Sequence, residues 1–313
     1  DENNPENVFN LVSYLNREQY GDRPLLFGQF WDSEMSDERG DGSPVYTATY
    51  KVMKGGRVEK LFYDGWSADH YVEGKPDLSI ENEYIITDKR EGSEPIYEPQ
   101  FTMLFPRMYS SQASHVQQYK DWSDFKGVPI RWTDRENKPT IIYKPTQGEN
   151  LKFFVNYQVN HMYWRYFLWN FAGRQNDIQS TGSGILEGNW YSGLKFVDQE
   201  RLGNQDQLPT SMTDNKAMNS FYLLPMILGL IGLVYQLVKN IRDWTIVMLL
   251  FFFTGLAIVI YLNQTPLQPR ERDYAYVGSF YAFAIWIGLG VFALYDAARG
   301  FALRDLVAPS ASG

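Results

Sequence analysis

Three long stretches without a charged side chain constrain this chain more than any other feature of its sequence. They cover residues 217–238, 244–262 and 274–295, and none contains Asp, Glu, Lys or Arg. Each has close to the roughly 20 residues that a helix needs to cross about 30 Å of hydrocarbon. Lipid offers no hydrogen-bond partner to the backbone, so a helix is the expected structure for each stretch. The alternative is three buried helices of a soluble protein, which three consecutive stretches of this length disfavour.

A large polar region precedes these stretches, and its pattern alternates between strand-like runs and turns. The β-prone runs 46–52 and 58–63 flank Gly55-Gly56, which predicts a hairpin. Further expected elements are a short amphipathic helix that starts at Asn4-Pro5-Glu6 and ends before Gly21, and strands over 25–27, 80–87 and 140–144. The sequence therefore predicts an α-helical integral membrane protein with about three transmembrane helices and a mixed α+β extracytoplasmic region.

We divide the chain into four parts. These are a polar α+β region (1–150), an aromatic helix with a Gly- and Asn-rich loop (151–216), the transmembrane helices (217–298) and a tail (299–313). The chain starts at Asp1 rather than Met and ends in a short run of small residues, which predicts a fragment of a larger multi-spanning fold.

The segment 153–172 is rich in aromatic residues and carries Arg165 as its only full charge. Phe154, Tyr157, His161 and Trp164 recur at helical spacing, which predicts a helix with one aromatic stripe. Its asparagines and central arginine disfavour a membrane-spanning helix. Two placements remain open, an interfacial helix at the membrane surface and a helix buried beneath the polar region.

The distribution of basic residues bears on orientation. Lys239 and Arg242 separate the first two uncharged stretches, and Arg299 and Arg304 follow the third. The positive-inside rule slightly favours the orientation in which these ends are cytoplasmic over the reverse orientation. The expected localisation is the inner (cytoplasmic) membrane as a multi-pass protein, with residues 1–216 on the periplasmic or extracytoplasmic side.

Composition excludes several function classes. The net charge of −8 argues against a nucleic-acid partner, which would require a basic face. The chain has no cysteine, and its three histidines, His70, His115 and His161, are far apart in the sequence. We therefore expect no histidine or cysteine metal site, while dependence on a divalent metal stays open.

The segment between the second and third stretches is the strongest candidate for chemistry. Pro269 precedes four consecutive ionisable residues, Arg270, Glu271, Arg272 and Asp273, and Tyr274 follows them. The guanidinium of arginine presents a fork of donors that matches phosphate oxygens, so an arginine pair at a membrane surface suits a lipid-linked phosphate. The alternative is a loop whose arginines are neutralised by its own two acids.

Several segments of the chain resemble one family. They are residues 7–28, Phe105-Pro106-Arg107-Met108-Tyr109-Ser110, 156–177 and 261–290, and the most specific parts are 163–166 and 268–274. They are similar to large bacterial polytopic membrane proteins that were long described as a domain of unknown function. Those proteins are grouped with protein O-mannosyltransferase-like glycosyltransferases.

The resemblance implies a GT-C-like fold and a lipid-linked sugar donor. Such enzymes move a sugar from a polyprenyl-phosphate carrier to a hydroxyl group of a protein or glycan acceptor outside the cytoplasm. Their acidic catalytic motif lies in the first external loop, so we expect the catalytic base outside this chain. The implied substrate-binding residues are Arg270 and Arg272 on the phosphate, Glu271, Asp273 and Tyr274 as supports, and Arg165 and His161 as secondary candidates. The rival hypothesis is a non-enzymatic membrane scaffold or transport component.

Overall fold

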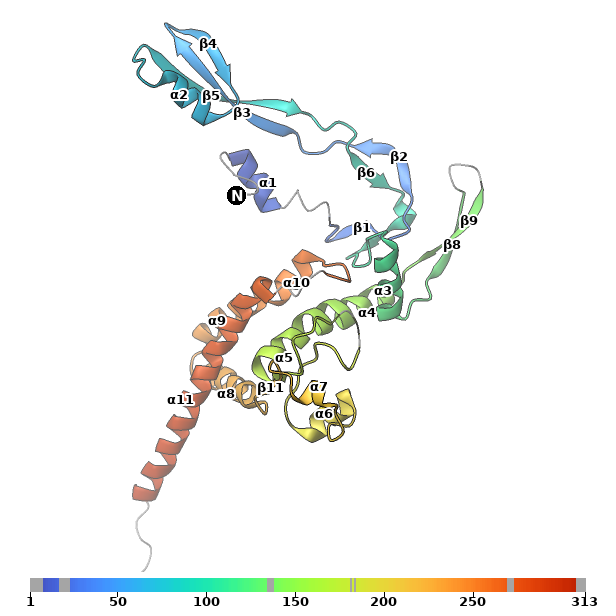
Figure 1. Cartoon of the computed structure of the whole chain (residues 1–313), viewed down its shortest axis with the longest axis vertical. Helices are drawn as coiled ribbons and strands as arrows, with labels where there is room; N and C mark the ends of the chain where they lie inside the picture. Colours follow the sequence, from blue (N-terminus) through green and yellow to red (C-terminus); the bar gives the residue numbers. More distant parts are fainter. Residues whose placement is uncertain are drawn as a thin grey trace, which may run out of the picture. The chain divides into compact units, whose positions relative to one another are not determined.

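The computed structural model describes residues 8–16, 23–133, 138–180, 182, 184–268 and 273–307 (Figure 1). The chain forms two compact units, the first made of residues 1–23 and 33–102 and the second of residues 24–32 and 103–313. The expected division at residue 150 lies inside the second unit, within helix α4 (Gln147–Phe153). Part of the polar region thus folds together with the apolar helices.

The first unit is built on a three-stranded antiparallel sheet of order β4-β3-β5. The predicted hairpin is confirmed, because β3 (Val45–Lys54) pairs with β4 (Arg57–Phe62). Gly55 and Gly56 connect these strands with φ values of +54° and +79°, which glycine adopts without strain. The predicted strand over 80–87 is also confirmed, as part of β5 (Leu78–Asp88), which pairs with β3.

The first unit also contains short elements that the sequence did not predict. Helix α2 (Gly65–Val72) contacts all three strands of the sheet, and β2 (Met35–Gly40) pairs with β6 (Glu94–Tyr97). The expected N-terminal helix is confirmed as α1 (Val8–Asn16), and its Phe9 ring stacks on Tyr46 of β3 at 4.2 Å. Short polar elements of this kind have too few apolar positions to produce a readable period.

A long helical segment runs through the second unit. It consists of α4, a π-helical stretch (Phe154–Trp164) and α5 (Arg165–Phe171), so the predicted helix over 153–172 is confirmed. Thr146 and Glu149 form a capping box at its start, in which each side chain accepts from the backbone N–H of the other residue. The hairpin β8 (Val128–Thr133) and β9 (Pro139–Lys144) and helix α3 (Ala113–Ser123) precede it, and the short strands β1 (Phe27–Gln29) and β7 (Thr102–Leu104) pair with each other.

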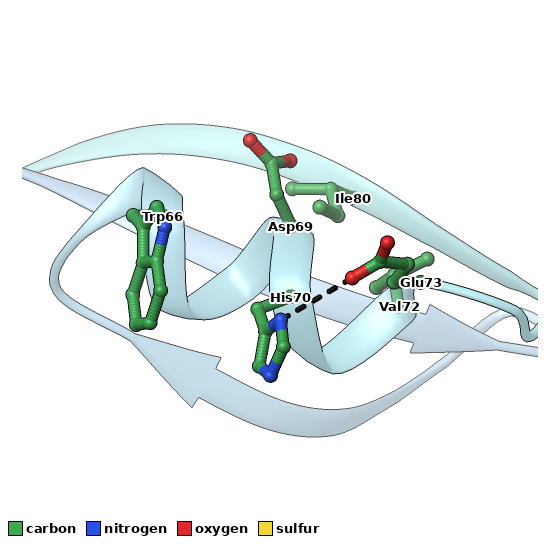
Figure 2. A pocket seen from close by; sticks show the side chains of 6 residues that line it. All are labelled: Trp66, Asp69, His70, Val72, Glu73 and Ile80. Carbon is green, nitrogen blue, oxygen red and sulfur yellow. Dashed lines mark ion pairs between the residues drawn. The ribbon is translucent and has the colours of Figure 1, made fainter.

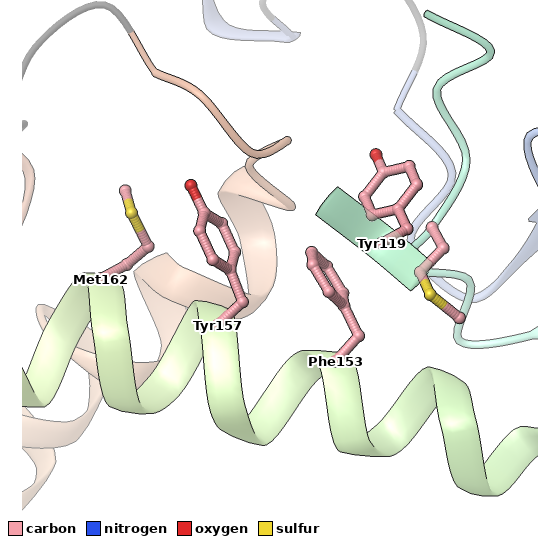
Figure 3. Packing of buried hydrophobic residues seen from close by; sticks show 5 residues of the cluster. Tyr119, Phe153, Tyr157 and Met162 are labelled. Carbon is pink, nitrogen blue, oxygen red and sulfur yellow. The ribbon is translucent and has the colours of Figure 1, made fainter. Parts of the chain in front are cut away.

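The long helical segment is buried along most of its length. Its first half packs on α3 through Tyr119, Phe153, Tyr157 and Met162, and Figure 3 shows the last three projecting from one side of the helix. Its second half packs on α11 through a cluster that contains Phe167, Phe171, Phe283 and Trp286. Within this unit the long helical segment is therefore buried, and α3 and α11 form part of the structure that covers it.

Residues 173–223 contain more regular structure than the loop that the sequence predicts. Helices α6 (Lys195–Leu202) and α7 (Thr210–Thr213) form here, and β10 (Gly173–Arg174) pairs with β11 (Asn219–Ser220). This pairing changes the expected first span. The uncharged stretch starts at residue 217, but its first residues extend as β11, and Tyr222 and Leu223 take positive φ values. Helix α8 (Leu224–Lys239) therefore begins late and has only 16 residues.

Among the residues that the structure describes, two helices are long and apolar enough to cross a membrane, judged by length and composition. The first covers Ile241–Leu262 and consists of α9 (Ile241–Phe253) and α10 (Leu256–Leu262), which meet at Thr254 and Gly255. The second is Val277–Gly300, within α11 (Val277–Val307), which continues into the expected tail. Only 17% of the most apolar window of the first helix and 33% of that of the second are buried, so most of each window is not enclosed by protein.

Helices α8 and α11 approach each other through glycine. A Cβ atom on Gly232 would lie 1.8 Å from the carbonyl oxygen of Trp286, and one on Gly290 would lie 2.0 Å from that of Leu228. Backbones at this separation leave no room for a side chain. Small residues at such crossings are typical of helix pairs in membranes, where association depends on close packing.

Candidate functional site

The strongest cluster of buried polar groups lies where α10 ends. Asn263 terminates this helix in the left-handed conformation, with φ +38° and ψ 55°, which asparagine tolerates better than most residues. Its side chain is fully buried, and its Nδ2 group donates to the carbonyl oxygens of Pro24 at 2.8 Å and Pro106 at 2.9 Å. One amide thus joins three segments that are distant in the sequence.

Gln158 approaches Asn263 from the π-helical stretch. Its Nε2 group donates to Asn263 Oδ1 at 3.1 Å and to the backbone oxygen of Gln264 at 2.9 Å. The hydroxyl group of Tyr109 donates to the backbone oxygen of Asn263 at 3.1 Å. The π-helix, defined by backbone i→i+5 hydrogen bonds, is rare in proteins. Where it does occur, it is often at a functional site. Here the π-helical stretch presents a buried amide, 1% exposed, to the chain that leaves α10.

Several polar atoms of this cluster are buried without a protein partner in the described part of the chain. They are both amide atoms of Gln264, which is 3% exposed, the Oε1 atom of Gln158 and the Nε atom of Arg107. Buried polar groups in folded proteins are nearly always hydrogen-bonded to protein or to ordered water. Ordered water commonly satisfies such buried donors and acceptors in folded proteins.

Arg107 provides a buried positive charge beside this cluster. Its Nη atoms donate to the backbone oxygens of Ile260 at 2.8 Å and Leu25 at 3.3 Å, and its guanidinium lies 3.5 Å from the centre of the Phe105 ring. Burial lowers the pKa of Arg107 to about 10, so the side chain remains protonated at neutral pH. No carboxylate forms an ion pair with it among the residues that the structure describes. The last turn of α10, with its partial negative charge, supplies the nearest compensation.

The segment that the sequence singles out continues directly from this cluster. Arg270, Glu271 and Arg272 lie outside the described residues, and of Asp273 only the backbone is described. Tyr274 is 59% exposed. The flanking residues are held at both ends. Gln268 donates to Thr265 O at 2.7 Å and accepts from Gln179 Nε2 at 2.6 Å, and Tyr276 is 2% exposed and belongs to a buried cluster with Tyr163 and Val259.

Arg165, one of the secondary candidates, organises a neighbouring loop. Its side chain is 7% exposed and donates to His161 O at 3.0 Å and to Gly188 O at 2.6 Å. The same loop is closed by the Asn176 side chain, which accepts from the backbone N–H of Gly188 at 2.9 Å. These contacts give Arg165 an anchoring role for residues 176–189.

His161, the other secondary candidate, lies in an aromatic stack. Its ring is parallel to that of Tyr157, with centroids 5.5 Å apart, and is tilted against Trp122 at 5.2 Å. Burial, and secondarily the charge of Arg165, lowers the pKa of His161 to about 4, so the imidazole is neutral at pH 7. Tyr157, its stacking partner, donates to Thr265 O at 3.5 Å, which places His161 one ring away from the candidate site.

The residues that carry this site were mostly missed by sequence reasoning. Arg107, Tyr109, Gln158 and Asn263 all lie in segments that resemble the family, but the sequence assigns none of them a role. The available signal was the amide pair Asn263-Gln264 directly after an uncharged stretch, where helix C-caps are expected. Within the described ranges, no three His, Asp or Glu side chains come together as a metal site would require.

Comparison with known proteins adds one finding. Residues 21–155 match the model of a family described as "Family of unknown function (DUF8416)", which is less than half of the 313 residues. No curated protein and no solved structure matches the chain. The matched segment includes Arg107 and Tyr109 but ends before Gln158 and Asn263. This family match gives no evidence of a relationship to glycosyltransferases and no indication of bacterial origin.

Proposed function

We propose that this chain is an integral membrane protein in which Ile241–Leu262 and Val277–Gly300 cross the bilayer. The supporting observation is the exposure of their apolar side chains, because a core helix of a soluble protein would be mostly buried. Helix α9 has no buried residue at all among those described. At 16 residues and about 1.5 Å per residue, α8 is shorter than the hydrocarbon layer. It packs on α11 through Gly229 and Gly232, and we propose that it carries the chain across the bilayer as a third, shorter span.

In this arrangement the polar cluster at Asn263 lies at one face of the membrane, since it connects the end of one span to the start of the next. Lys239, Arg242 and Arg299 then lie toward the opposite face. The positive-inside rule places that opposite face in the cytoplasm. We therefore propose an inner-membrane protein whose residues 1–216 and 263–276 are extracytoplasmic.

The function that best combines these features is that of a glycosyltransferase using a polyprenyl-phosphate sugar. Arg270 and Arg272 would contact the phosphate of the carrier at headgroup depth, with Glu271, Asp273 and Tyr274 supporting them. What carries this proposal is the anchoring of the flanking chain. Gln158, Gln179 and Tyr109 hold residues 263–268 through hydrogen bonds, so the chain that leads to the two arginines is anchored.

The proposed reaction transfers a glycosyl group between oxygens. An acceptor hydroxyl on a protein or glycan attacks the anomeric carbon, and its proton passes to a base outside this chain. The bond between the anomeric carbon and the phosphate oxygen breaks, and polyprenyl phosphate leaves with the electron pair. The arginines stabilise that negative charge.

The test uses the complete protein that contains this chain, reconstituted in nanodiscs, with a radiolabelled polyprenyl-phosphate hexose as donor. Arg270→Ala and Arg272→Ala are each expected to lower turnover by about tenfold or more, which corresponds to the loss of one charge-assisted contact. Arg299→Ala, at the opposite end of the second span, is the matched control and should retain parental turnover. Activity that survives the Arg270→Ala/Arg272→Ala double substitution would remove the site assignment. Absence of both turnover and donor binding would favour the scaffold hypothesis.

A further inference from the structure

Helix α2 of the first unit presents an unusual face to solvent. Trp66, Asp69 and His70 occupy positions i, i+3 and i+4, which place them along one side of the helix, and Glu73 is its C-cap residue. This side is open, because Trp66 is 75% exposed and the side chains of His70 and Glu73 are 69% and 77% exposed.

The opposite side of α2 explains how the helix is held without this face. Ala68 is fully buried, and Tyr71 lies against Phe62 of β4 with ring centroids 5.4 Å apart. The Tyr71 hydroxyl donates to Glu59 at 3.2 Å, and the ammonium group of Lys75 lies 3.7 Å from the Tyr71 ring. Asp64 caps the helix by accepting from the backbone N–H of Ser67 at 2.7 Å. The exposed face is therefore not needed to attach α2 to the sheet.

The two rings on the open face stack on each other, and the indole of Trp66 remains 75% exposed. Trp66 and His70 are parallel within 4°, with centroids 5.3 Å apart, and the Nδ1 atom of His70 lies 3.2 Å from a carboxylate oxygen of Glu73. Figure 2 shows the two rings one helical turn apart, with Glu73 reaching back to His70. The His70 ring is oriented by stacking on Trp66 and by its contact with the carboxylate of Glu73, and it supports the indole of Trp66 in return.

A pocket of about 410 Å³ opens over this face, with Val72 and Ile80 completing its lining. This volume lies within the roughly 300–1,000 Å³ that is typical of small-molecule sites. The lining combines an apolar aromatic surface with carboxylate acceptors and one imidazole. No metal ligand set of three or more His, Asp or Glu is present among the described residues.

We propose that this pocket binds a neutral hexopyranose residue. A pyranose ring has an apolar C–H face, which stacks on an indole, and hydroxyl groups at its edge, which donate to carboxylates such as Asp69 and Glu73. The two carboxylates disfavour a phosphorylated or otherwise anionic ligand. They also disfavour insertion of Trp66 into an anionic membrane surface. The site lies in the first unit and does not depend on the proposed transfer reaction.

The test measures binding without any donor substrate, so failure of the glycosyltransferase proposal would leave it intact. The whole chain is reconstituted in nanodiscs, since alkyl glycoside detergents would occupy a sugar site. Methyl glucopyranoside, methyl mannopyranoside and methyl galactopyranoside are then examined separately by saturation-transfer difference NMR. At least one is expected to show transfer concentrated on the ring C–H protons of one face.

Three variants decide the outcome. Trp66→Ala should weaken binding by about tenfold or more, as loss of a stacking platform requires, while Trp66→Phe should retain most of it. Tyr63→Ala is the matched control, because Tyr63 is a 64% exposed aromatic residue two positions before α2 that does not line the pocket. Equal transfer in the parent and in Trp66→Ala would overturn the proposal. So would the absence of signal for all three glycosides at millimolar concentrations, or binding of choline in place of the sugars.

Discussion

Helices α2 and α9 show how differently the two units of this protein treat their exposed surface. Helix α2 buries Ala68 and exposes Trp66, Asp69 and His70, two of which are polar. Helix α9 buries none of its described residues, and Ile246, Phe252 and Phe253 are among those exposed. The same force explains both patterns if the first helix faces water and the second faces hydrocarbon. In water the burial of apolar area stabilises the fold, whereas in lipid this gain disappears and close packing must replace it.

The crossing of α8 and α11 gives the strongest way to break this comparison. Gly232→Leu would place a side chain where even a Cβ atom meets the carbonyl oxygen of Trp286 at 1.8 Å. We expect the two helices to separate, with a loss of about 5 kcal/mol or more. The measurement is thermal unfolding and size-exclusion behaviour in detergent. Gly288→Leu is the control, because a Cβ atom at Gly288 meets nothing within 4 Å. Equal destabilisation by both substitutions would contradict the packing argument.

The Asn263 cluster provides the next largest expected effect. Asn263→Ala removes hydrogen bonds to Pro24 O, Pro106 O and Gln158 Nε2 and places alanine at φ +38°. Loss of buried hydrogen bonds together with left-handed strain should cost roughly 3–4 kcal/mol. Chemical denaturation monitored by tryptophan fluorescence would measure this loss.

Asn170→Ala is the matched control for Asn263→Ala. Asn170 is also an asparagine of the second unit, but it is exposed, and its side chain bonds only to the Tyr166 carbonyl one turn earlier. Its removal should change stability by less than about 0.5 kcal/mol. If the two alanine variants were equally stable, the cluster would not be holding residues 263–268.

Acidification should affect the second unit through His161. Burial lowers the pKa of this imidazole to about 4 in the folded chain, against an ordinary value of 6.5, so the unfolded chain binds the proton first. Stability from this group is therefore complete above pH 6.5 and is lost as the pH falls from 6.5 toward 4. The loss is on the order of 2–3 kcal/mol.

Comparing His161→Phe with the parent isolates this effect, because all other titratable groups are the same in both proteins. The phenylalanine preserves stacking on Tyr157 and against Trp122 but cannot take up a proton. The parent should lose more stability than the variant between pH 7 and pH 4, as measured by denaturant midpoints. Parallel curves over this range would show that His161 titrates normally in the folded protein.

The sequence was informative where a local signal sufficed. The hairpin at Gly55-Gly56, the strand over 80–87 and the helix over 153–172 each follow from spacing or turn chemistry and are confirmed. The first uncharged stretch was misleading, because hydropathy does not reveal that its first residues pair with Gly173 and Arg174 as β11. Pro225 at the start of α8 was a usable signal, since proline favours the first turn of a helix.

The candidate site could not be predicted in the same way, because its contacts join distant parts of the chain. Gln158 and Asn263 are 105 positions apart, and Asn263 and Pro24 are 239 apart. Nothing in the local composition pairs these residues. The prediction that Arg270 and Arg272 bind phosphate stays a prediction, and the structure adds the network that anchors the chain just before them.

The smallest expected effect sharpens the comparison between the two units. The indole N–H of Trp286 in α11 donates to Gln236 Oε1 in α8 at 2.8 Å, and this hydrogen bond links two helices of the proposed membrane region. Gln236→Leu removes the acceptor and leaves the N–H of a side chain that is only 1% exposed. Interhelical hydrogen bonds in membranes contribute about 0.6 kcal/mol on average, so the loss should be near 1 kcal/mol.

In the first unit, Asp64→Ala removes the α2 N-cap and should cost a similar amount, about 1 kcal/mol. If Gln236→Leu instead cost several times as much as Asp64→Ala, polar contacts rather than glycine packing would dominate the α8–α11 pair, and the contrast between the units would need to be redrawn.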